Sequence, residues 1–447
     1  MDGLLEFIVD TLLLLHWIDE DWKPHCCILE FKYFPPLHNK WTTCELVLNV
    51  LKYYNLHTKF RAITTDSGGE MPPAMKHVMK ALNGEFCLGL EEDWHIRCVC
   101  HIMNRAVIEC ENLIKYEVSK IRTILKTIRN CVPMRLELKK IQVRLGRTDN
   151  RIVDVPNIDV ENRWNSMFLM IDSCYKLKDV FETLCNMDEF KVKFQDPMTS
   201  LQWCTLKAIT DFLQPAYELT VQASGHYATL SMLPLIFEFL SNHCNSTIDA
   251  NPNSDFIFPS AIQAAKAMLN KIEKYKSNLT SPLAQLALAL DPAIPNTESE
   301  TESMKHLIRT TLTRDYGYHS AVQLAPEGKP KGLLAAARAA RAPSGYNINV
   351  DEVEDFFDFT KKGDESCNDA VEWWGTIGRK RFPVIAHLAR DTLMCMGSSV
   401  PSESSFSDSG HFLTNNRASL NDENIEKMMK LWSWNRLLSK THSSSIG

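Results

Sequence analysis

The chain has 447 residues, of which 45% are hydrophobic, and its formal net charge at pH 7 is −6. This composition predicts a folded globular protein of roughly two to four domains. The small negative charge excludes DNA binding through the overall charge of the chain, so DNA binding would require a local basic surface.

The cysteines and the apolar runs indicate where the protein resides. None of the 14 cysteines forms a CxxC pair, and their spacings are not those of a small secreted scaffold, so we expect reduced thiols in the cytoplasm or nucleus. The longest apolar runs are well below the ~20 residues that span a bilayer, so we expect no membrane segment.

The first hundred residues alternate strand and helix patterns. Residues 12–18 and 26–33 predict an antiparallel hairpin. A helix over 43–56, a strand over 60–65 and a helix over 73–82 should follow. This order favours a mixed α/β sheet over a helical bundle.

The middle of the chain is almost wholly helical in pattern, from residue 102 to about 285. The helical runs are expected at 102–145, 165–185, 201–245 and 260–288. This region is too long for one α/β layer and predicts a helical insertion.

Two stretches beyond it, 296–303 and 325–347, are poor in large apolar residues and predict linkers. The acidic segment 351–369 predicts a solvated tether that packs a few aromatic residues. Helical sequence returns over about 370–440.

A basic cluster over residues 119–147 contains nine Lys or Arg and a single acid, Glu137. Apolar residues at helical spacing should place these charges on the solvent side of a packed helix. Such a surface could bind DNA phosphates, and an ordinary solvated helix face is the alternative. The basic residues are Lys120, Arg122, Lys126, Arg129, Arg135, Lys139, Lys140, Arg144 and Arg147.

Two isolated acids are candidates for a metal site. Asp66 ends a predicted strand and precedes small residues, a common arrangement for holding Mg²⁺, although an Asp that opens a glycine turn is the simpler interpretation. Glu403 lies in a Ser-rich stretch after a predicted amphipathic helix. Cys98 and His101 form a CxxH pair, but two ligands cannot close a zinc site, so we expect structural roles for both.

In its motifs the chain resembles the hAT superfamily of transposases, the group of hobo, Activator and Tam3. Eight short matches occur in the family's order across nearly the whole chain. They are HWIDEDW at 16–22, ITTD at 63–66, RCVCHIMN at 97–104, RWNS at 163–166, LDP at 290–292, WW at 373–374, FP at 382–383 and PSESSFS at 401–407.

The resemblance implies an RNase H-like mixed sheet that is interrupted by a large all-helical insertion and followed by a helical C-terminal dimerisation block. The expected division is a first part of the core at 1–100 and a helical region with the insertion at 101–295. A linker with an acidic segment at 296–369 and a dimerisation region that completes the core at 370–440 should follow.

The resemblance also implies three metal-binding acids, of which Asp66 matches the second and Glu403 the third. The first is an Asp in a Trp-Thr context, and the nearest acid here, Asp2, has a different context. We therefore expect an N-terminally truncated, domesticated relative that lacks this Asp and the BED zinc finger, needs no cofactor and does not cleave DNA. The alternative is a fragment of an active cut-and-paste transposase that uses Mg²⁺ or Mn²⁺ for two-metal phosphoryl transfer.

For partners, the resemblance implies self-association, with DNA as a second partner, in the nucleus. Trp164, next to Arg163, matches a family tryptophan that stacks on a flipped-out base, and a core tryptophan is the alternative. A DNA-binding regulator without catalysis is a third hypothesis. The apolar face expected to form the dimer comprises Trp373, Trp374, Phe382, Pro383, Ile385, Leu388 and Leu393.

Overall fold

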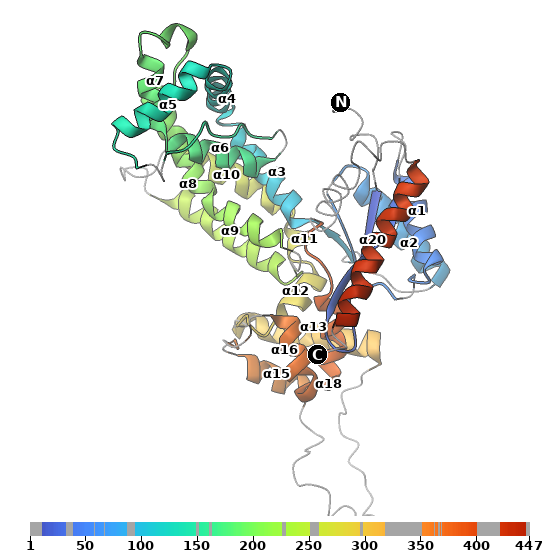
Figure 1. Cartoon of the computed structure of the whole chain (residues 1–447). Helices are drawn as coiled ribbons and strands as arrows, with labels where there is room; N and C mark the ends of the chain where they lie inside the picture. Colours follow the sequence, from blue (N-terminus) through green and yellow to red (C-terminus); the bar gives the residue numbers. More distant parts are fainter. Residues whose placement is uncertain are drawn as a thin grey trace, which may run out of the picture.

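The computed structural model divides into three regions, which we call the hairpin layer, the helical arm and the C-terminal cluster (Figure 1). The structure describes residues 11–32, 39–57, 59–66, 68–86, 94–148, 152–160, 163–225, 229–250, 259–295, 298–317, 351–361, 363–364, 367, 369–399 and 421–443.

The hairpin layer is a two-stranded antiparallel sheet between helices. Strands β1 (Thr11–Ile18) and β2 (Pro24–Lys32) pair as the sequence predicts. Helix α20 (Asp422–Ser443) covers one face, where Ile425 and Met429 pack against Ile28 and Phe31. Side chains alternate across a strand, so Leu13 points to the other face and packs on helices α1 (Lys40–Tyr53) and α2 (Met71–Phe86).

A second, parallel sheet consists of β3 (Ile63–Thr65) and β4 (His95–Arg97). The predicted single mixed sheet is not present in the described residues, because the strands there form two separate two-stranded sheets. A largely apolar cavity of ≈ 440 Å³ lies between them, lined by β1, α1, β3 and residues 394–399. The mixture of strands and helices is confirmed, whereas an RNase H-like sheet is not.

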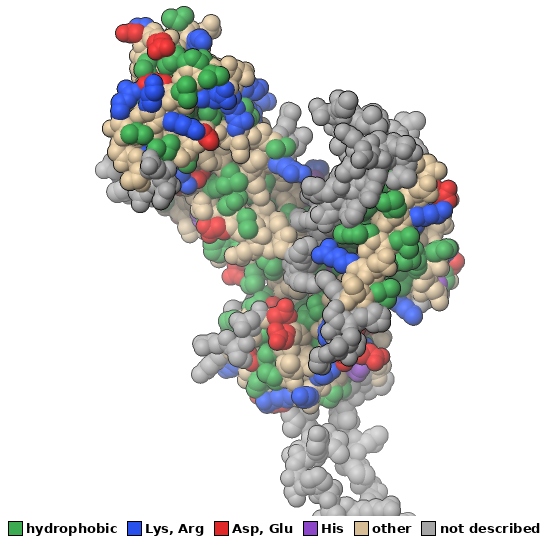
Figure 2. Space-filling model, viewed as in Figure 1, with side chains coloured by type: hydrophobic (Ala, Val, Ile, Leu, Met, Phe, Trp, Pro, Cys, Tyr) green, Lys and Arg blue, Asp and Glu red, His purple; other side chains and the backbone are tan. Residues whose placement is uncertain are grey.

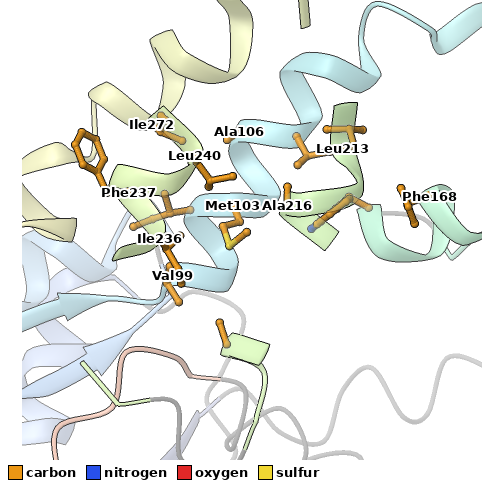
Figure 3. Packing of buried hydrophobic residues seen from close by; sticks show 14 of the residues in the cluster. Val99, Met103, Ala106, Phe168, Leu213, Ala216, Ile236, Phe237, Leu240 and Ile272 are labelled. Atoms are coloured by element: carbon orange, nitrogen blue, oxygen red, sulfur yellow. The ribbon is translucent and has the colours of Figure 1, made fainter. Parts of the chain in front are cut away.

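The helical arm confirms the predicted all-helical region (Figure 1). Helix α3 packs against α8 and α10, and Val99, Met103 and Ala106 lie among side chains of α6, α8, α9 and α10 (Figure 3). The helices are α3 (Val99–Glu111), α4 (Lys115–Arg129), α5 (Val132–Arg144), α6 (Trp164–Tyr175), α7 (Lys178–Asn186), the 3-10 turn η3 (Lys191–Lys193), α8 (Ser200–Ala223), α9 (Met232–Asp249) and α10 (Pro259–Glu273).

The C-terminal cluster is also helical and carries the aromatic residues of the WW and FP motifs. Its elements are α11 (Lys276–Leu279), α12 (Pro282–Ala289), α13 (Glu298–Tyr316), α15 (Glu352–Thr360), α16 (Ala370–Trp373), the π-helix η4 (Trp374–Gly378), α17 (Arg379–Arg381) and α18 (Pro383–Leu393).

The predicted linker over 296–369 is wrong at residues 298–316 and 352–360, which are helical. Residues 298–303 open helix α13, whose later residues Met304, Ile308 and Leu312 supply a buried stripe. The acidic segment forms α15, and Arg309 of α13 pairs with Asp351 at 2.6 Å. Acidic residues favour the first turn of a helix through its dipole, so a charged sequence there is compatible with a packed helix. Residues 325–347 lie outside the described ranges.

Candidate functional site

Asp66 lies directly after β3, and its carboxylate contacts the backbone two residues further on. Its Oδ1 accepts a hydrogen bond from the amide of Gly68 at 3.0 Å, and its side chain is exposed. A Cβ on residue 68 would lie 3.1 Å from that same Oδ1, so glycine allows this tight approach. This geometry is that of an Asp opening a glycine turn, one of the two interpretations that the sequence left open.

His95 of β4 lies beside this turn. Its Nε2 is 2.9 Å from Thr65 Oγ1, and burial together with Arg97 lowers the pKa of His95 to about 4. The imidazole is therefore neutral at physiological pH and links the adjacent strands by a hydrogen bond.

The segment that leads to Glu403 runs alongside β3. Thr64 Oγ1 donates to the Met396 carbonyl at 2.6 Å, and the Val99 amide donates to the Gly397 carbonyl at 3.0 Å. The fold thus places residues 396–399 beside β3, at Thr64, two positions before Asp66. The two segments are more than 300 positions apart in the sequence. Glu403 and Asp2 themselves lie outside the described residues.

A divalent metal needs several oxygen ligands that converge on one point. Within the described ranges, no group of three or more His, Cys, Asp or Glu side chains is placed to hold a metal. Asp66 is the single predicted ligand among them, so these residues do not by themselves form the implied two-metal site. No metal-dependent step follows from their geometry.

Cys98 and His101 make separate contacts at the start of α3. Cys98 occupies the N-cap position of α3 without a side-chain capping bond, and its buried Sγ accepts from the Ser399 amide at 3.3 Å. Hydrogen bonding from Cys100 and from Ser399 holds the pKa of Cys98 well below its usual value. His101 Nε2 accepts from Arg105 Nε at 3.0 Å. The thiol thus anchors residues 398–399 to α3, while the imidazole contacts the next turn of the helix.

The structure places Trp164 in the core, not at a surface where a base could stack on it. Its indole is buried in the helical arm and lies edge-on to Phe168 and Tyr217, at 6.3 Å between ring centroids in each case. A base can stack only on an exposed ring face, so the core tryptophan is the interpretation that fits this structure. Arg163, one residue earlier, is exposed.

The basic cluster is not one solvent-facing surface. Lys120 is only 7% exposed, and its Nζ donates to Asp196 Oδ1 at 2.7 Å and to the Pro197 carbonyl at 2.9 Å. Arg122 Nε donates to Asp159 Oδ1 at 2.8 Å, and Arg129 donates to the Pro156 carbonyl at 2.9 Å. These three cations bind loops of the arm itself, which the sequence could not show.

Other members of the cluster remain at the surface, where Lys and Arg side chains gather on the upper part of the arm (Figure 2). Lys126 is exposed. Lys139 pairs with Asp154 at 2.6 Å, and Lys140 pairs with Glu137 at 3.2 Å. Exposed pairs of this kind contribute little to stability and leave the cations accessible to a phosphate.

The predicted dimer face is mostly buried within the chain. Trp374 is fully buried, its Nε1 donates to the Leu290 carbonyl at 2.8 Å, and its ring lies 5.3 Å from that of Phe356 in α15. Trp373, Phe382, Ile385, Leu388 and Leu393 belong to the same core, whereas Pro383 is exposed. The helical spacing correctly indicated a buried face, but its partners are α12 and α15 rather than a second chain.

Comparison with known families gives three matches in order along the chain. Residues 11–91 match the ZBED1 RNase-like domain, and residues 96–212 match the ZBED1 RNase-like helical domain. Residues 352–435 match the hAT family C-terminal dimerisation region. The three matches fall, in this order, on the hairpin layer, the helical arm and the C-terminal helices.

Curated relatives resemble the chain over much of its length. It is 22% identical to the Putative AC transposase of Zea mays over 453 residues, covering 94% of this chain and 54% of that protein. It is 22% identical to Zinc finger BED domain-containing protein RICESLEEPER 2 of Oryza sativa subsp. japonica, covering 95% and 62%. Similarity to DAYSLEEPER of Arabidopsis thaliana is 23%, covering 65% and 42%.

The chain thus spans between 42% and 62% of the length of these three relatives.

Within the described ranges, no helix combines the length and apolar composition that crossing a membrane requires.

Proposed function

We propose that this chain, which is a hAT-family transposase-like protein, self-associates through its C-terminal region as its principal activity. The observation that carries the proposal is the match of residues 352–435 to the family's dimerisation region. The described part of this region is folded and packed, because α15, η4 and α18 share one core.

The dimerisation region is not an independent domain. Its helices α15 and α18 pack on α13 and α12, whereas α20 packs on β2 of the hairpin layer. Two separate regions of the molecule therefore hold the matched segment in place. Any test of self-association must use the full chain, because an excised C-terminal segment would lose both supports.

Size-exclusion chromatography with multi-angle light scattering measures the mass in solution. At micromolar concentration we expect a mass of twice 51.1 kDa or a higher multiple. A mass of 51.1 kDa throughout the concentration series would overturn the proposal.

We further propose that the chain in this form does not cleave DNA. The support is that Asp66 Oδ1 is engaged with the Gly68 amide at 3.0 Å, and that among the described residues no further His, Cys, Asp or Glu side chains group with it to hold a metal. The alternative is a fragment of an active DNA transposase. Two observations support it, namely the similarity to the AC transposase and the approach of residues 396–399 to β3.

A strand-cleavage assay with Mg²⁺ or Mn²⁺ separates these two functions. We expect no cleavage by the unmodified chain. Robust cleavage that is abolished by Asp66→Ala and by Glu403→Ala would establish the alternative.

Residual DNA binding without sequence preference is a second proposal, with the nucleus as the compartment. It rests on the exposed Lys126, Lys139 and Lys140 of the arm, since Lys120, Arg122 and Arg129 are engaged within the fold. Binding of short duplexes should weaken steeply with salt. Unchanged binding in a variant with Lys126, Lys139 and Lys140 replaced by Gln would refute the role of these three residues.

A further inference from the structure

A further cavity, of ≈ 200 Å³, lies where the hairpin layer reaches the C-terminal cluster (Figure 1). We call it the junction cavity. It is lined by the turn end of the β1–β2 hairpin, Thr229 before α9, the turn after α12, the start of α16 and the end of α18. An apolar cavity of about 150 Å³ holds a molecule the size of benzene, so the junction cavity has room for a small organic ligand. Ala293 and Asp369 in its lining are exposed, which gives such a ligand access from solvent.

Asp291 brings a carboxylate to the junction cavity without a cation to balance its charge. Its Oδ2 accepts from Ser231 Oγ at 3.0 Å, and its Oδ1 accepts from the Ala293 amide at 3.2 Å. No Lys or Arg of the described residues pairs with it. Burial, together with the charge of nearby Asp369, raises the pKa of Asp291. The neutral donors satisfy its hydrogen bonds, whereas the charge itself stays unfavourable unless a cation lies beside it.

The rest of the lining adds negative rather than positive charge. Asp369 supplies a second carboxylate, whose Oδ1 accepts from the Glu372 amide at 2.9 Å. Burial lowers the pKa of His16 to about 4, so its imidazole is neutral at pH 7. His25 pairs with Asp19 at 2.7 Å. Since no Lys or Arg occurs among the described residues that line the cavity, an anion is disfavoured there.

Apolar and aromatic side chains complete the lining. Val371, Leu393 and Met396 are buried, and Trp17 stacks on His25 at 5.1 Å between ring centroids. Aromatic rings attract organic cations, and the aliphatic side chains suit a hydrocarbon stem. A bare metal ion would use neither, and the described residues offer no group of three or more metal-ligating side chains.

We infer that the junction cavity binds an alkylammonium group, with the ammonium beside Asp291 and Asp369 and the carbon chain against the apolar lining. A free small amine and a lysine side chain of another protein present this same group. The inference is separate from the proposed self-association and from DNA binding, because one chain supplies the whole cavity.

Isothermal titration calorimetry on the full chain tests this inference with pentylammonium. The neutral comparison is 1-pentanol, which has the same number of non-hydrogen atoms. Asp291→Asn removes the charge but keeps both contacts, since the new amide can accept from Ala293 and donate to Ser231. Asp369→Asn removes the other charge, and asparagine is equally suited to the start of a helix. The matched control is Asp211→Asn, because Asp211 is exposed on α8 of the helical arm.

The wild type and Asp211→Asn should bind pentylammonium equally, with a dissociation constant of ~1 mM or lower. Both cavity variants, with circular dichroism spectra that verify folding, should bind it at least ~10-fold more weakly, and so should the wild type with 1-pentanol. No binding to the wild type at ~10 mM pentylammonium would overturn the inference. Equal binding of 1-pentanol, or unchanged binding by both folded cavity variants, would overturn it as well.

Two further ligands distinguish the sources of the ammonium group. Tighter binding of cadaverine than of Nα-acetyl-lysine amide supports a free amine as the ligand, and the reverse order supports a lysine of another protein. Failure of either ligand to compete with pentylammonium would contradict the shared chemistry. Self-association is measured independently of these titrations, so it stands or fails on its own.

Discussion

Replacement of Trp374 by Phe should destabilise the fold of each chain. Trp374 is fully buried and donates from Nε1 to the Leu290 carbonyl at 2.8 Å. Phe removes this donor from a buried carbonyl and leaves a void where the indole was wider. Together these losses should lower the free energy of unfolding by about 2 to 4 kcal/mol.

The measurement is urea unfolding followed by far-UV circular dichroism, with Trp41→Phe as the control. Trp41 is 59% exposed and stacks on His77, so its replacement should change the free energy of unfolding by less than ~0.5 kcal/mol. If Trp374→Phe left the urea midpoint unchanged but converted the oligomer to monomers, Trp374 would belong to a dimer interface and the core described above would be wrong.

Three further changes test the packing. Gly378→Ala should lower the urea midpoint, because the added Cβ would overlap the Trp374 ring, and an unchanged midpoint would exclude that close approach. Lys120→Met should lower the thermal midpoint of the folded chain, because it removes the hydrogen bonds that hold α4 to the loop before α8 and to the first turn of α8, and calorimetry showing no decrease would contradict this role. Burial holds the pKa of His16 and His95 at about 4 in the folded state, below the ordinary histidine value of 6.5, so the unfolded chain binds more protons between pH 4 and pH 6.5. Stability should therefore fall as the pH decreases from 6.5 towards 4, by up to about 3 kcal/mol for each histidine, and replacing both by Gln should flatten a pH series of urea midpoints.

The hairpin and the helical arm were predictable because their patterns are local. Strands over 11–18 and 24–32 alternate side chains on either side of a short turn, and the arm repeats apolar residues at helical spacing. In contrast, residues 298–303 resemble a linker on their own, since the apolar residues that anchor α13 come later in the same helix.

The candidate sites were harder to predict, because a sequence pattern does not identify the partner of a side chain. The spacing of Ile385 and Leu388 correctly indicated a buried face, but an internal core and a dimer interface give the same pattern. Lys120 looked like a surface cation because Asp196, its partner, lies 76 residues further along the chain.

Site-specific photo-crosslinking tests most directly whether the C-terminal region joins two chains. Benzoylphenylalanine in place of Asn435, which is exposed on α20 within the region that matches the family's dimerisation region, should yield a covalent dimer of the full chain on irradiation. The same group in place of Leu201 on the helical arm should yield none. Equal crosslinking from both positions, or crosslinking from position 201 alone, would contradict self-association through the C-terminal region.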